Sequence, residues 1–576
     1  MRKRLIVAVV AILALTGSAL VAPAQVVQPC DLGAGGDYSG PYPSVSEPGP
    51  YTIGEQQIVE LDSELDGVTI QMALLRPNVP AGVKVPVIAT AGPYYHALQT
   101  LDLRACESFL TENYVPQGYA VAVIAVRGTG DSGGCMNLFG PGERADLNQA
   151  ITWLGTQAWS TGSVGMIGLS YDGGTPWEVA SFGNPYLKTI VPLEGVPDLF
   201  QLMYRQGRID FRGPLILNAL YYQQSLVAFA PGRSLQHTIE VAACPEYATG
   251  LAASAYSSAT GRLDPFGFWA ERRFRDEILA NYHGSVYMVQ GLLDWNVDPG
   301  LQYPWIWELE SAGITVKHLL GQWGHQWPFS DGGRQDWADV LLNWFDRWLK
   351  DDLAAPTGPK YEIEDSDGGW RAADSWPDGP ATTFWLDPTS TLSTSPSSAG
   401  SDELVWLDPF HTQLGVETGM PPLDGLRDVC LPGCALFQTP PLAQQIRFGA
   451  LPSADLEVTP LGPGGQLTVY VYESLSSEVN RLGWGQFDLR FQDGSDEPQQ
   501  IAPGETLRVR FDLQPLDAVV HQGARLIVIV SGGTAWNRLP TVPNYPMMLH
   551  TGGAASSVTF PTVEPDPSDF FFPPSE

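Results

Sequence analysis

The stretch Val164–Gly174, which reads VGMIGLSYDGG, decides the fold of this chain. Its first half is apolar and has the length of a buried strand, and the segment after Ser170 has the character of a helix. A sharp turn from strand to helix lifts a serine hydroxyl above a sheet and directs the helix N-terminus toward it. The stretch therefore predicts a nucleophile elbow at Ser170, although Asp172 stands where the general Gly-x-Ser-x-Gly pattern has its second glycine.

Short apolar runs alternate with helix-like segments from residue 85 to residue 324. Helical spacing of apolar residues marks the segments Glu143–Gln157 and Gln335–Leu349. This alternation is typical of a parallel sheet covered by helices on both faces, so we predict an α/β fold. The predicted strands are Val85–Thr90, Ala120–Val126, Val164–Ile167, Thr189–Leu193, Val286–Gln290 and Thr315–Leu320.

An acid and a histidine follow the serine along the chain. Asp294 comes after the fifth predicted strand and His325 after the sixth. The order Ser, Asp, His is that of an α/β-hydrolase, in which the histidine takes the serine proton and the acid fixes the imidazole tautomer. We therefore predict Ser170, Asp294 and His325 as the catalytic triad, because the competing His318 lies inside a predicted strand.

The negative charge that develops on a substrate carbonyl oxygen needs hydrogen-bond donors. The backbone N–H of Tyr171, at the start of the helix after the serine, is one candidate. The loop after the first predicted strand reads Gly92-Pro93-Tyr94-Tyr95, so a tyrosine hydroxyl from this loop is a candidate for the second donor.

Residues 199–274 interrupt the alternation and are rich in Tyr, Leu, Arg and Phe. An insertion at this point stands over the carboxyl ends of the strands, where open α/β sheets bind ligands, and we predict a helical cap. The catalytic domain is expected to span residues 25–380, this cap included.

The character of the chain changes after residue 380. Short alternating strands separated by turn residues, without long helices, predict a jelly-roll-like β-sandwich over residues 381–576. Examples of such strands are Leu467–Tyr472, Leu507–Leu513 and Ala524–Val530.

The N-terminus has the parts of a secretory signal peptide. Basic residues at positions 2 to 4 precede an apolar stretch over residues 5–21, and Ala22-Pro23-Ala24 offers small residues for cleavage. We predict that residues 1–24 are a signal peptide and that the mature protein is extracellular or periplasmic. An uncleaved membrane anchor is the alternative, and no other stretch is apolar enough to span a bilayer.

The net charge limits the classes of binding partner, and the cysteine content indicates disulfides. A net charge of −32 with no basic patch argues against binding to nucleic acid or to an anionic membrane. Six cysteines in an exported chain favour disulfides, and Cys430 and Cys434 are close enough in sequence for a disulfide that closes a small loop. A metal site at these two residues is the weaker interpretation, because no second Cys or His cluster stands nearby.

Five motifs in this order resemble the Xaa-Pro dipeptidyl-peptidase family of serine hydrolases, which also holds cocaine-esterase-like and α-amino-acid ester hydrolases. They are Pro93-Tyr94, the turn RGTGDSG at residues 127–133, GLSYDG at 168–173, GLLDWNV at 291–297 and Gly324-His325. The stretch Asp512–Ile529 is similar to the non-catalytic C-terminal β-sandwich of the same family, so the resemblance covers nearly all of the chain after the signal segment.

The resemblance implies that Tyr94 is the side-chain oxyanion donor, that a helical cap covers the site and that no cofactor or metal is needed. It also implies that a residue other than glycine at position 172, followed by Gly173, is normal. Asn296 and Val297 stand where the amino-acid ester hydrolases carry carboxylates, which speaks against that branch.

A dipeptidyl-peptidase must hold the free ammonium group of its substrate, and a buried carboxylate does so by charge pairing. Glu194 and Asp198 are the candidates, with a helix-capping or loop carboxylate as the alternative for each. Trp177 and Trp295 are candidates for an apolar proline slot, with core packing as the alternative.

The sequence favours a secreted exopeptidase that releases Xaa-Pro dipeptides through an acyl-enzyme. An esterase or acylase on small esters or amides is the alternative among enzymes. A surface- or carbohydrate-binding protein with an inactive hydrolase scaffold is the alternative of another class, and the intact Ser, Asp and His argue against it. The oligomeric state stays open, a homo-oligomer included.

Overall fold

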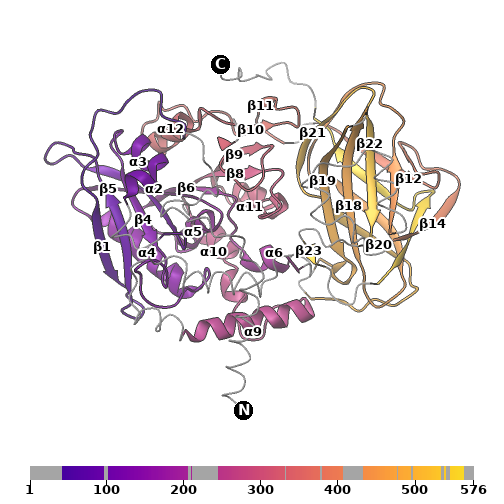
Figure 1. Ribbon diagram of the computed structural model, residues 1–576, viewed down its shortest axis with the longest axis horizontal. Helices are drawn as coiled ribbons and strands as arrows, with labels where there is room; N and C mark the ends of the chain where they lie inside the picture. The colour runs from indigo at the N-terminus through magenta and orange to yellow at the C-terminus, as the bar shows by residue number, and fades with distance from the viewer. Residues whose placement is uncertain are drawn as a thin grey trace, which may run out of the picture.

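The computed structural model describes residues 42–95, 102–204, 209–210, 244–330, 333–376, 379–405, 433–476, 478–494, 497–532, 538–539 and 545–563. It shows an N-terminal part with a mixed sheet between helices and a C-terminal all-β part (Figure 1). The predicted fold class is confirmed. The predicted signal peptide, residues 1–24, lies outside the described residues.

The N-terminal sheet has ten strands that are parallel in the middle and antiparallel at both edges. The six predicted apolar runs form β3, β4, β5, β6, β8 and β9, and the edge strands were not predicted. In spatial order the strands are β1 (Gln57–Asp62), β2 (Thr69–Leu75), β4 (Ala120–Ala125), β3 (Val85–Gly92), β5 (Ser160–Leu169), β6 (Leu187–Leu193), β8 (Ser285–Gly291), β9 (Thr315–Gly321), β10 (Tyr361–Glu364) and β11 (Trp370–Ala373).

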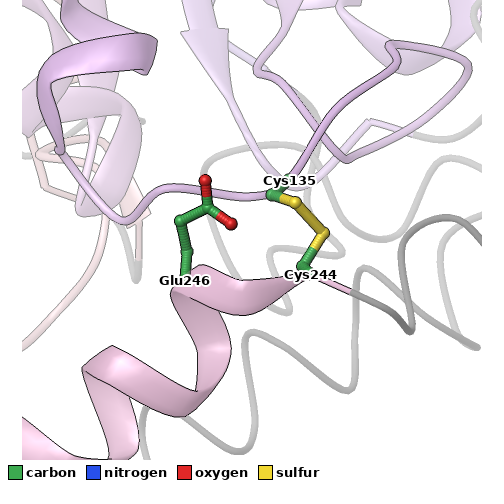
Figure 2. Close-up of side chains that lie close together, drawn as sticks. All are labelled: Cys135, Cys244 and Glu246. Atoms are coloured by element: carbon green, nitrogen blue, oxygen red, sulfur yellow. A yellow bond between two sulfur atoms is a disulfide. The ribbon is translucent and has the colours of Figure 1, made fainter.

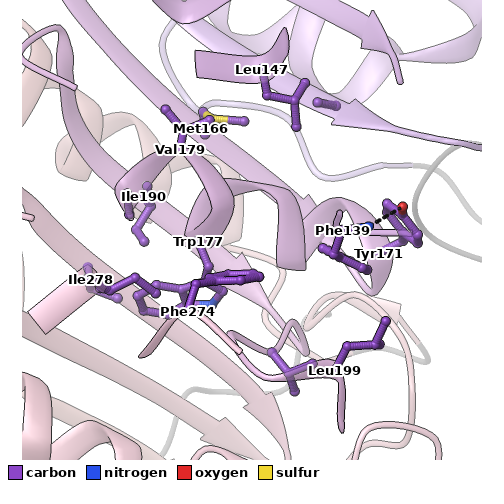
Figure 3. Packing of buried hydrophobic residues seen from close by; sticks show 14 of the residues in the cluster. Phe139, Leu147, Met166, Tyr171, Trp177, Val179, Ile190, Leu199, Phe274 and Ile278 are labelled. Atoms are coloured by element: carbon purple, nitrogen blue, oxygen red, sulfur yellow. Dashed lines mark hydrogen bonds between the residues drawn. The ribbon is translucent and has the colours of Figure 1, made fainter. Parts of the chain in front are cut away.

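Helices cover both faces of this sheet because successive strand residues point to opposite sides. Met166 of β5 belongs to the core cluster on one face, together with Trp177 and Val179 of the helix after it (Figure 3). Ile167 belongs to the cluster on the other face. The helices of this part are α2 (Leu103–Cys106), α3 (Ser108–Tyr114), α4 (Pro141–Thr156), α5 (Tyr171–Ala180), α10 (Arg275–Asn281), α11 (Trp305–Ser311) and α12 (Trp337–Leu349), with short 3-10 turns η3 (Ala270–Arg272) and η4 (Pro299–Leu301).

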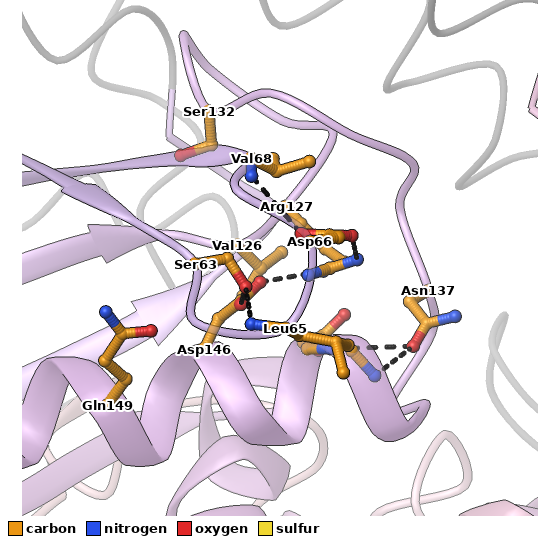
Figure 4. A network of polar contacts seen from close by, with 12 residues as sticks. Ser63, Leu65, Asp66, Val68, Val126, Arg127, Ser132, Asn137, Asp146 and Gln149 are labelled. Carbon is orange, nitrogen blue, oxygen red and sulfur yellow. Dashed lines mark hydrogen bonds and ion pairs between the residues drawn. The ribbon is translucent and has the colours of Figure 1, made fainter.

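The RGTGDSG turn after β4 is held by a buried guanidinium. Arg127 donates from Nε to Asp146 of α4 at 2.7 Å and from Nη1 to Asp66 at 3.1 Å (Figure 4). Ser132 of the same turn donates to the carbonyl of Ala125 at 2.7 Å. These contacts fix the loop between β4 and α4 against the sheet.

The described part of the predicted cap is mainly helical and is attached to that loop. It comprises α6 (Leu199–Tyr204), α9 (Pro245–Thr260) and η3, while residues 205–208 and 211–243 lie outside the described part of the chain. A disulfide joins Cys135, in the loop after β4, to Cys244 at the start of α9 (Figure 2). The buried Arg272 donates to the carbonyls of Asn137 and Leu138 at 2.6 and 2.8 Å, so two contacts anchor the cap.

The C-terminal part is a β-sheet structure whose buried residues form a core cluster of their own. The predicted strands near residues 467, 507 and 524 form β18, β20 and β22. Cys434 is disulfide-bonded, and Cys430, its predicted partner, lies outside the described residues. The strands are β12 (Ala381–Asp387), β13 (Thr391–Ser393), β14 (Gly400–Val405), β15 (Cys434–Gln438), β16 (Ile446–Ala450), β17 (Ser453–Pro460), β18 (Gln466–Leu475), β19 (Glu478–Asp488), β20 (Leu507–Asp512), β21 (Leu516–Val520), β22 (Arg525–Ser531), β23 (Arg538–Leu539), β24 (Met547–Gly552) and β25 (Ser557–Pro561), with the 3-10 turn η6 (Leu489–Phe491).

The cap also meets the C-terminal part. The backbone of β7 (Ile209–Asp210) pairs antiparallel with β23, so the insertion is tied to both parts of the molecule. In the part of the chain that the structure describes, no helix is long and apolar enough to cross a membrane.

Asp517 of β21 makes several polar contacts between the two parts. Its carboxylate is fully buried and accepts hydrogen bonds from Arg371 and Trp376 of the N-terminal part and from Arg447, at 2.8 to 2.9 Å. Its backbone carbonyl accepts from the side chain of Gln322 at 2.8 Å. The carboxylate is thus satisfied by donors from both sides of the junction.

Asp517→Ala should therefore destabilise the whole protein. The substitution removes the buried ion-pair partner of Arg371, and breaking a buried ion pair costs about 3–5 kcal/mol. Thermal unfolding should show a lower midpoint, and limited proteolysis should separate the two parts. The control is Asp455→Ala, whose partners Arg508 and Arg510 are solvent-exposed and should contribute less than about 1 kcal/mol. Equal losses in the two variants would contradict a special role for Asp517.

Candidate active site

Ser170 stands on a sharp turn between β5 and α5. Its backbone has φ 65° and ψ −121°, a conformation that side-chain-bearing residues rarely adopt. The Ser170 N–H donates to the carbonyl of Leu193 at the end of β6, at 3.0 Å, and the Ser170 carbonyl accepts from the first turn of α5. The turn predicted from the sequence is present.

Glycines permit this turn because the chain approaches itself closely. A Cβ on Gly168 would lie 2.4 Å from the carbonyl oxygen of Asp172, and one on Gly173 would lie 2.2 Å from that of Leu193. These contacts explain why glycine is needed at positions 168 and 173 and not at position 172.

Asp172 points away from the serine, into the loop that carries Tyr94. Its carboxyl group is fully buried, accepts from the hydroxyl of Tyr95 at 2.8 Å and lies where a Cβ on Gly92 would stand. Burial raises the pKa of Asp172 well above its ordinary value. Asp172 therefore connects the helix after the serine to the loop after β3.

Pro176 is accommodated inside α5 by a neighbouring hydroxyl. Proline has no N–H to donate to the carbonyl four residues earlier, which here belongs to Asp172. The hydroxyl of Thr175 is 3.1 Å from that carbonyl oxygen and donates to Ala91 of β3 at 2.9 Å. The helix thus keeps its first turn and gains a contact to the strand that leads to Tyr94.

Tyr94 lies beside Tyr171. Their rings meet edge to face with centroids 6.4 Å apart, and Tyr94 is half-buried. Tyr171 is the first residue of α5, so its backbone N–H belongs to the helical turn that has no intrahelical acceptor. The Tyr171 ring stacks on Phe139 at 4.1 Å, and its hydroxyl accepts from the Phe139 N–H (Figure 3).

Two acids, Glu143 of α4 and Glu178 of α5 itself, are buried between these helices. The Tyr171 hydroxyl donates to Glu143 of α4 at 2.7 Å, and Glu178 of α5 carries two buried carboxyl oxygens without a hydrogen-bond donor. Burial raises the pKa of Glu143 to about 7. Burial, followed by repulsion from Glu143, raises the pKa of Glu178 well above its ordinary value.

Asp294 and His325 are hydrogen-bonded to each other at the carboxyl ends of β8 and β9. His325 Nδ1 is 2.9 Å from Asp294 Oδ2, while Asp294 Oδ1 accepts from the N–H groups of Asn296 and Val297. Burial by itself lowers the pKa of His325, but the charge and hydrogen bond of Asp294 and then those of Glu194 raise it to about 10. The competing His318 lies inside β9, fully buried and stacked on Tyr361.

Parallel strands bring these groups to one edge of the sheet. Ser170 follows β5, Asp294 follows β8 and His325 follows β9, and only β6 separates β5 from β8. The carboxyl ends of parallel strands form the binding edge of an open α/β sheet. The predicted triad residues therefore share one edge.

Glu194 lies behind the imidazole and not at an open surface. It is fully buried at the end of β6, with Oε2 at 2.9 Å from His325 Nδ1. Burial, followed by repulsion from Asp294, raises the pKa of Glu194 to about 8. This position argues against the predicted role as the substrate amine anchor, because the side chain is fully buried and contacts the imidazole.

Asp198 and Trp177 have contacts that favour the alternatives weighed for them. Asp198 Oδ1 accepts from the N–H of Gln201 in α6, and Oδ2 pairs with Arg273 at 2.9 Å, so this carboxylate caps a helix and is neutralised internally. Trp177 is fully buried against Trp305 and belongs to the core. Capping and core packing, the alternatives weighed for these two residues, describe them better than substrate binding.

The role of Trp295 in an apolar slot stays a prediction. It is half-buried directly after Asp294 and packs against a cluster of the C-terminal part that includes Tyr470, Tyr472 and Trp484. Sequence patterns could not reveal this contact, because it joins two domains.

Two groups of metal-ligand side chains lie close together among the described residues. Cys135, Cys244 and Glu246 form one group, but the two sulfur atoms are bonded to each other (Figure 2). The other group is Glu194, Asp294 and His325, the carboxylate–imidazole cluster of the site.

Two family models match the chain. The model of X-Pro dipeptidyl-peptidase (S15 family) matches residues 66–327, and that of the X-Pro dipeptidyl-peptidase C-terminal non-catalytic domain matches residues 355–553. The chain belongs to this family. It is a serine hydrolase that resembles the Xaa-Pro dipeptidyl-peptidases.

Curated relatives carry both peptidase and esterase names. A Bacillus cereus protein named "Putative Xaa-Pro dipeptidyl-peptidase" is 26% identical over 511 residues, which cover 82% of this chain and 84% of that protein. The cocaine esterase of a Rhodococcus strain is 24% identical and covers 88% of this chain and 94% of its own.

Solved structures share the fold. An α-amino acid ester hydrolase has a TM-score of 0.71 at 17% identity and covers 94% of this chain and 100% of its own. A CocE/NonD family hydrolase from Staphylococcus aureus has a TM-score of 0.67 at 17% identity, covering 89% of this chain and 94% of its own. At this identity the likeness concerns the fold alone.

The buried acids should make the protein less stable as pH rises. Glu143 has a pKa of about 7 and Glu194 of about 8 in the folded protein, both above their unfolded values. Between the unfolded and folded pKa the folded state binds more protons, so the free energy of unfolding falls with rising pH. The thermal midpoint should decrease from pH 5 toward pH 8.

The variant Glu178→Gln tests whether buried acids cause this pH dependence of stability. A neutral amide removes one of the buried titrating groups, so the fall of the thermal midpoint with pH should become shallower than in the wild type. Glu64→Gln, at an exposed position, is the control and should leave the slope unchanged. A midpoint that rises over the same pH range in the wild type would refute the argument.

Proposed function

We propose that this protein is an exported dipeptidyl-peptidase that releases Xaa-Pro dipeptides from peptide N-termini through an acyl-enzyme. The observation that supports this proposal most directly is the strained turn at Ser170, which lies at the same sheet edge as the hydrogen-bonded pair of Asp294 and His325. Family membership supports the reaction class, and the signal-like N-terminus supports export.

In the proposed acylation step, Ser170 Oγ attacks the substrate carbonyl carbon while its proton passes to His325 Nε2. The hydrogen bond from Nδ1 to Asp294 keeps Nε2 as the basic nitrogen and stabilises the imidazolium. The imidazolium then gives its proton to the leaving amine, and the C–N bond breaks. In deacylation, water attacks the ester through the same base and releases the dipeptide.

The proposed oxyanion donors are the Tyr171 backbone N–H and the Tyr94 hydroxyl. The first opens α5, and the second stands on the loop that Asp172, Tyr95 and Thr175 connect to that helix. One structural unit therefore carries the nucleophile and both donors, which is the preorganisation that oxyanion stabilisation requires.

An esterase or acylase is the second candidate, and one observation favours it. The two carboxylates nominated to anchor a substrate ammonium, Glu194 and Asp198, are occupied by partners within the protein. An enzyme for neutral esters or amides needs no such anchor. The cocaine esterase matches a larger share of both chains than the B. cereus protein does.

A substrate panel separates these candidates. Gly-Pro-anilide should be hydrolysed faster than Ala-Ala-anilide and much faster than acetyl-Gly-Pro-anilide, since acetylation removes the recognised cation. Ser170→Ala should lower turnover of every substrate by about 10⁴ to 10⁶ without changing the thermal midpoint greatly. Equal rates with and without the acetyl group would contradict the dipeptidyl-peptidase proposal and favour the esterase or acylase. Activity in Ser170→Ala would refute both proposed functions.

Tyr94→Phe tests the oxyanion donor. Loss of one donor should lower kcat by about 10² to 10³ with little change in KM, because the hydrogen bond forms mainly in the transition state. Tyr95→Phe is the matched control: it removes the hydroxyl that donates to Asp172, so it should lower stability more than Tyr94→Phe does. Wild-type kcat in Tyr94→Phe would exclude the role.

A further inference from the structure

The imidazole of His325 faces two carboxylates through one nitrogen. Asp294 Oδ2 and Glu194 Oε2 each lie 2.9 Å from Nδ1, and the side chains of both acids are fully buried. A Ser-His-Asp triad needs a single acid at this position. The second carboxylate has no part in the mechanism derived above.

The other oxygen of Glu194 joins the two loops that carry the acid and the histidine. Oε1 accepts from the backbone N–H of Gly291 at 3.1 Å and from the indole N–H of Trp323 at 3.2 Å. Gly291 stands three residues before Asp294, and Trp323 two residues before His325. One side chain therefore contacts both loops and the imidazole between them.

The backbone of Glu194 is held in an unusual conformation that directs the side chain there. Its φ of 49° lies in the left-handed region, as does that of Ser170 on the neighbouring strand. The Glu194 N–H donates to Val289 of β8, and a Cβ on the next residue, Gly195, would lie 2.0 Å from the backbone of Gly173. Strain of this kind persists only where surrounding contacts enforce it, and it gathers at functional sites.

We propose that Glu194 is a second acid partner of His325, a positioning residue that shares the Nδ1 proton with Asp294 and can replace it. The inference rests on the proposed function, since it assigns His325 as the base. The imidazole has one N–H at Nδ1 and donates it to one carboxylate at a time. The two oxygens lie at equal distance from Nδ1, but only Asp294 Oδ2 forms the hydrogen bond, while Glu194 Oε2 is buried without a hydrogen-bond partner. Loss of the Asp294 acceptor therefore leaves Glu194 Oε2 as the acceptor next to Nδ1.

The charges support this exchange. Burial raises the pKa of Glu194 most, and repulsion from the Asp294 carboxylate raises it further. In Asp294→Asn that repulsion is gone, so Glu194 ionises more readily and becomes the anion at Nδ1. The imidazole then keeps the tautomer with Nε2 directed to the serine.

A double-mutant cycle on hydrolysis of a neutral aryl ester tests the proposal. In an ordinary triad the Asp→Asn change lowers kcat by about 10⁴. Here Asp294→Asn should lower kcat by only about 10², and adding Glu194→Gln should bring the total loss to about 10⁴. Glu194→Gln alone should lower kcat by about tenfold with KM unchanged, because Asp294 remains.

The amide in Glu194→Gln is chosen because its oxygen can still accept from Gly291 and Trp323. Trp323→Phe is the complementary variant, which removes the indole donor and keeps the carboxylate. Glu362→Gln, at a buried ion-paired carboxylate on β10, controls for the loss of any buried charge in this sheet. It should not alter the effect of Asp294→Asn.

A spectroscopic measurement makes the test independent of turnover. In protein labelled with ¹⁵N-histidine, the low-field proton resonance of His325 Nδ1–H should persist in Ser170→Ala and in Asp294→Asn. It should disappear in the Glu194→Gln/Asp294→Asn double variant. Loss of the resonance in Asp294→Asn, or a full loss of about 10⁴ in kcat in that variant with no further effect of Glu194→Gln, would overturn the proposal. Activity in Ser170→Ala would instead refute the proposed function.

Discussion

The backbone conformation of Ser170 is the constraint on which the site depends. A residue with a side chain at φ 65° is strained, and the surrounding chain must hold it there. Gly168 and Gly173 allow the close contacts of the turn, and β6 accepts the Ser170 N–H. The same turn fixes where α5 begins and therefore where its first backbone N–H groups point.

Three buried acids hold the loops and the helix of this site, and they carry an electrostatic cost. Asp172 fixes the loop after β3, Glu143 holds the Tyr171 hydroxyl, and Glu194 contacts both loops of the acid–base pair. Burial raises the pKa of each of these three groups. Such groups are retained where a defined geometry matters more than stability, which is the situation at an active site.

Much of the fold was predictable because it depends on local pattern. The six apolar runs correspond to the six central parallel strands, and the placement of Ser170, Asp294 and His325 after their strands followed from chain order. The edge strands β1, β2, β10 and β11 are short or carry polar residues, so no apolar run marked them. The Cys135–Cys244 disulfide joins residues 109 apart, a pairing that the sequence leaves undetermined.

The contacts of Glu194, Asp198 and Trp177 favour the alternatives to substrate binding for a common reason. Chain order placed Glu194 and Asp198 near the carboxyl edge of the sheet, but such a position does not say whether a side chain is free to bind a substrate. That depends on partners distant in sequence: Trp323 and His325 for Glu194, Arg273 for Asp198 and Trp305 for Trp177.

The contact of Trp295 with the tyrosines of the C-terminal part likewise depends on residues distant in sequence. The loop that carries Asp294 is packed against the sandwich domain through this side chain. The C-terminal domain therefore helps to position the acid of the proposed triad, although it supplies none of the groups that carry out the reaction.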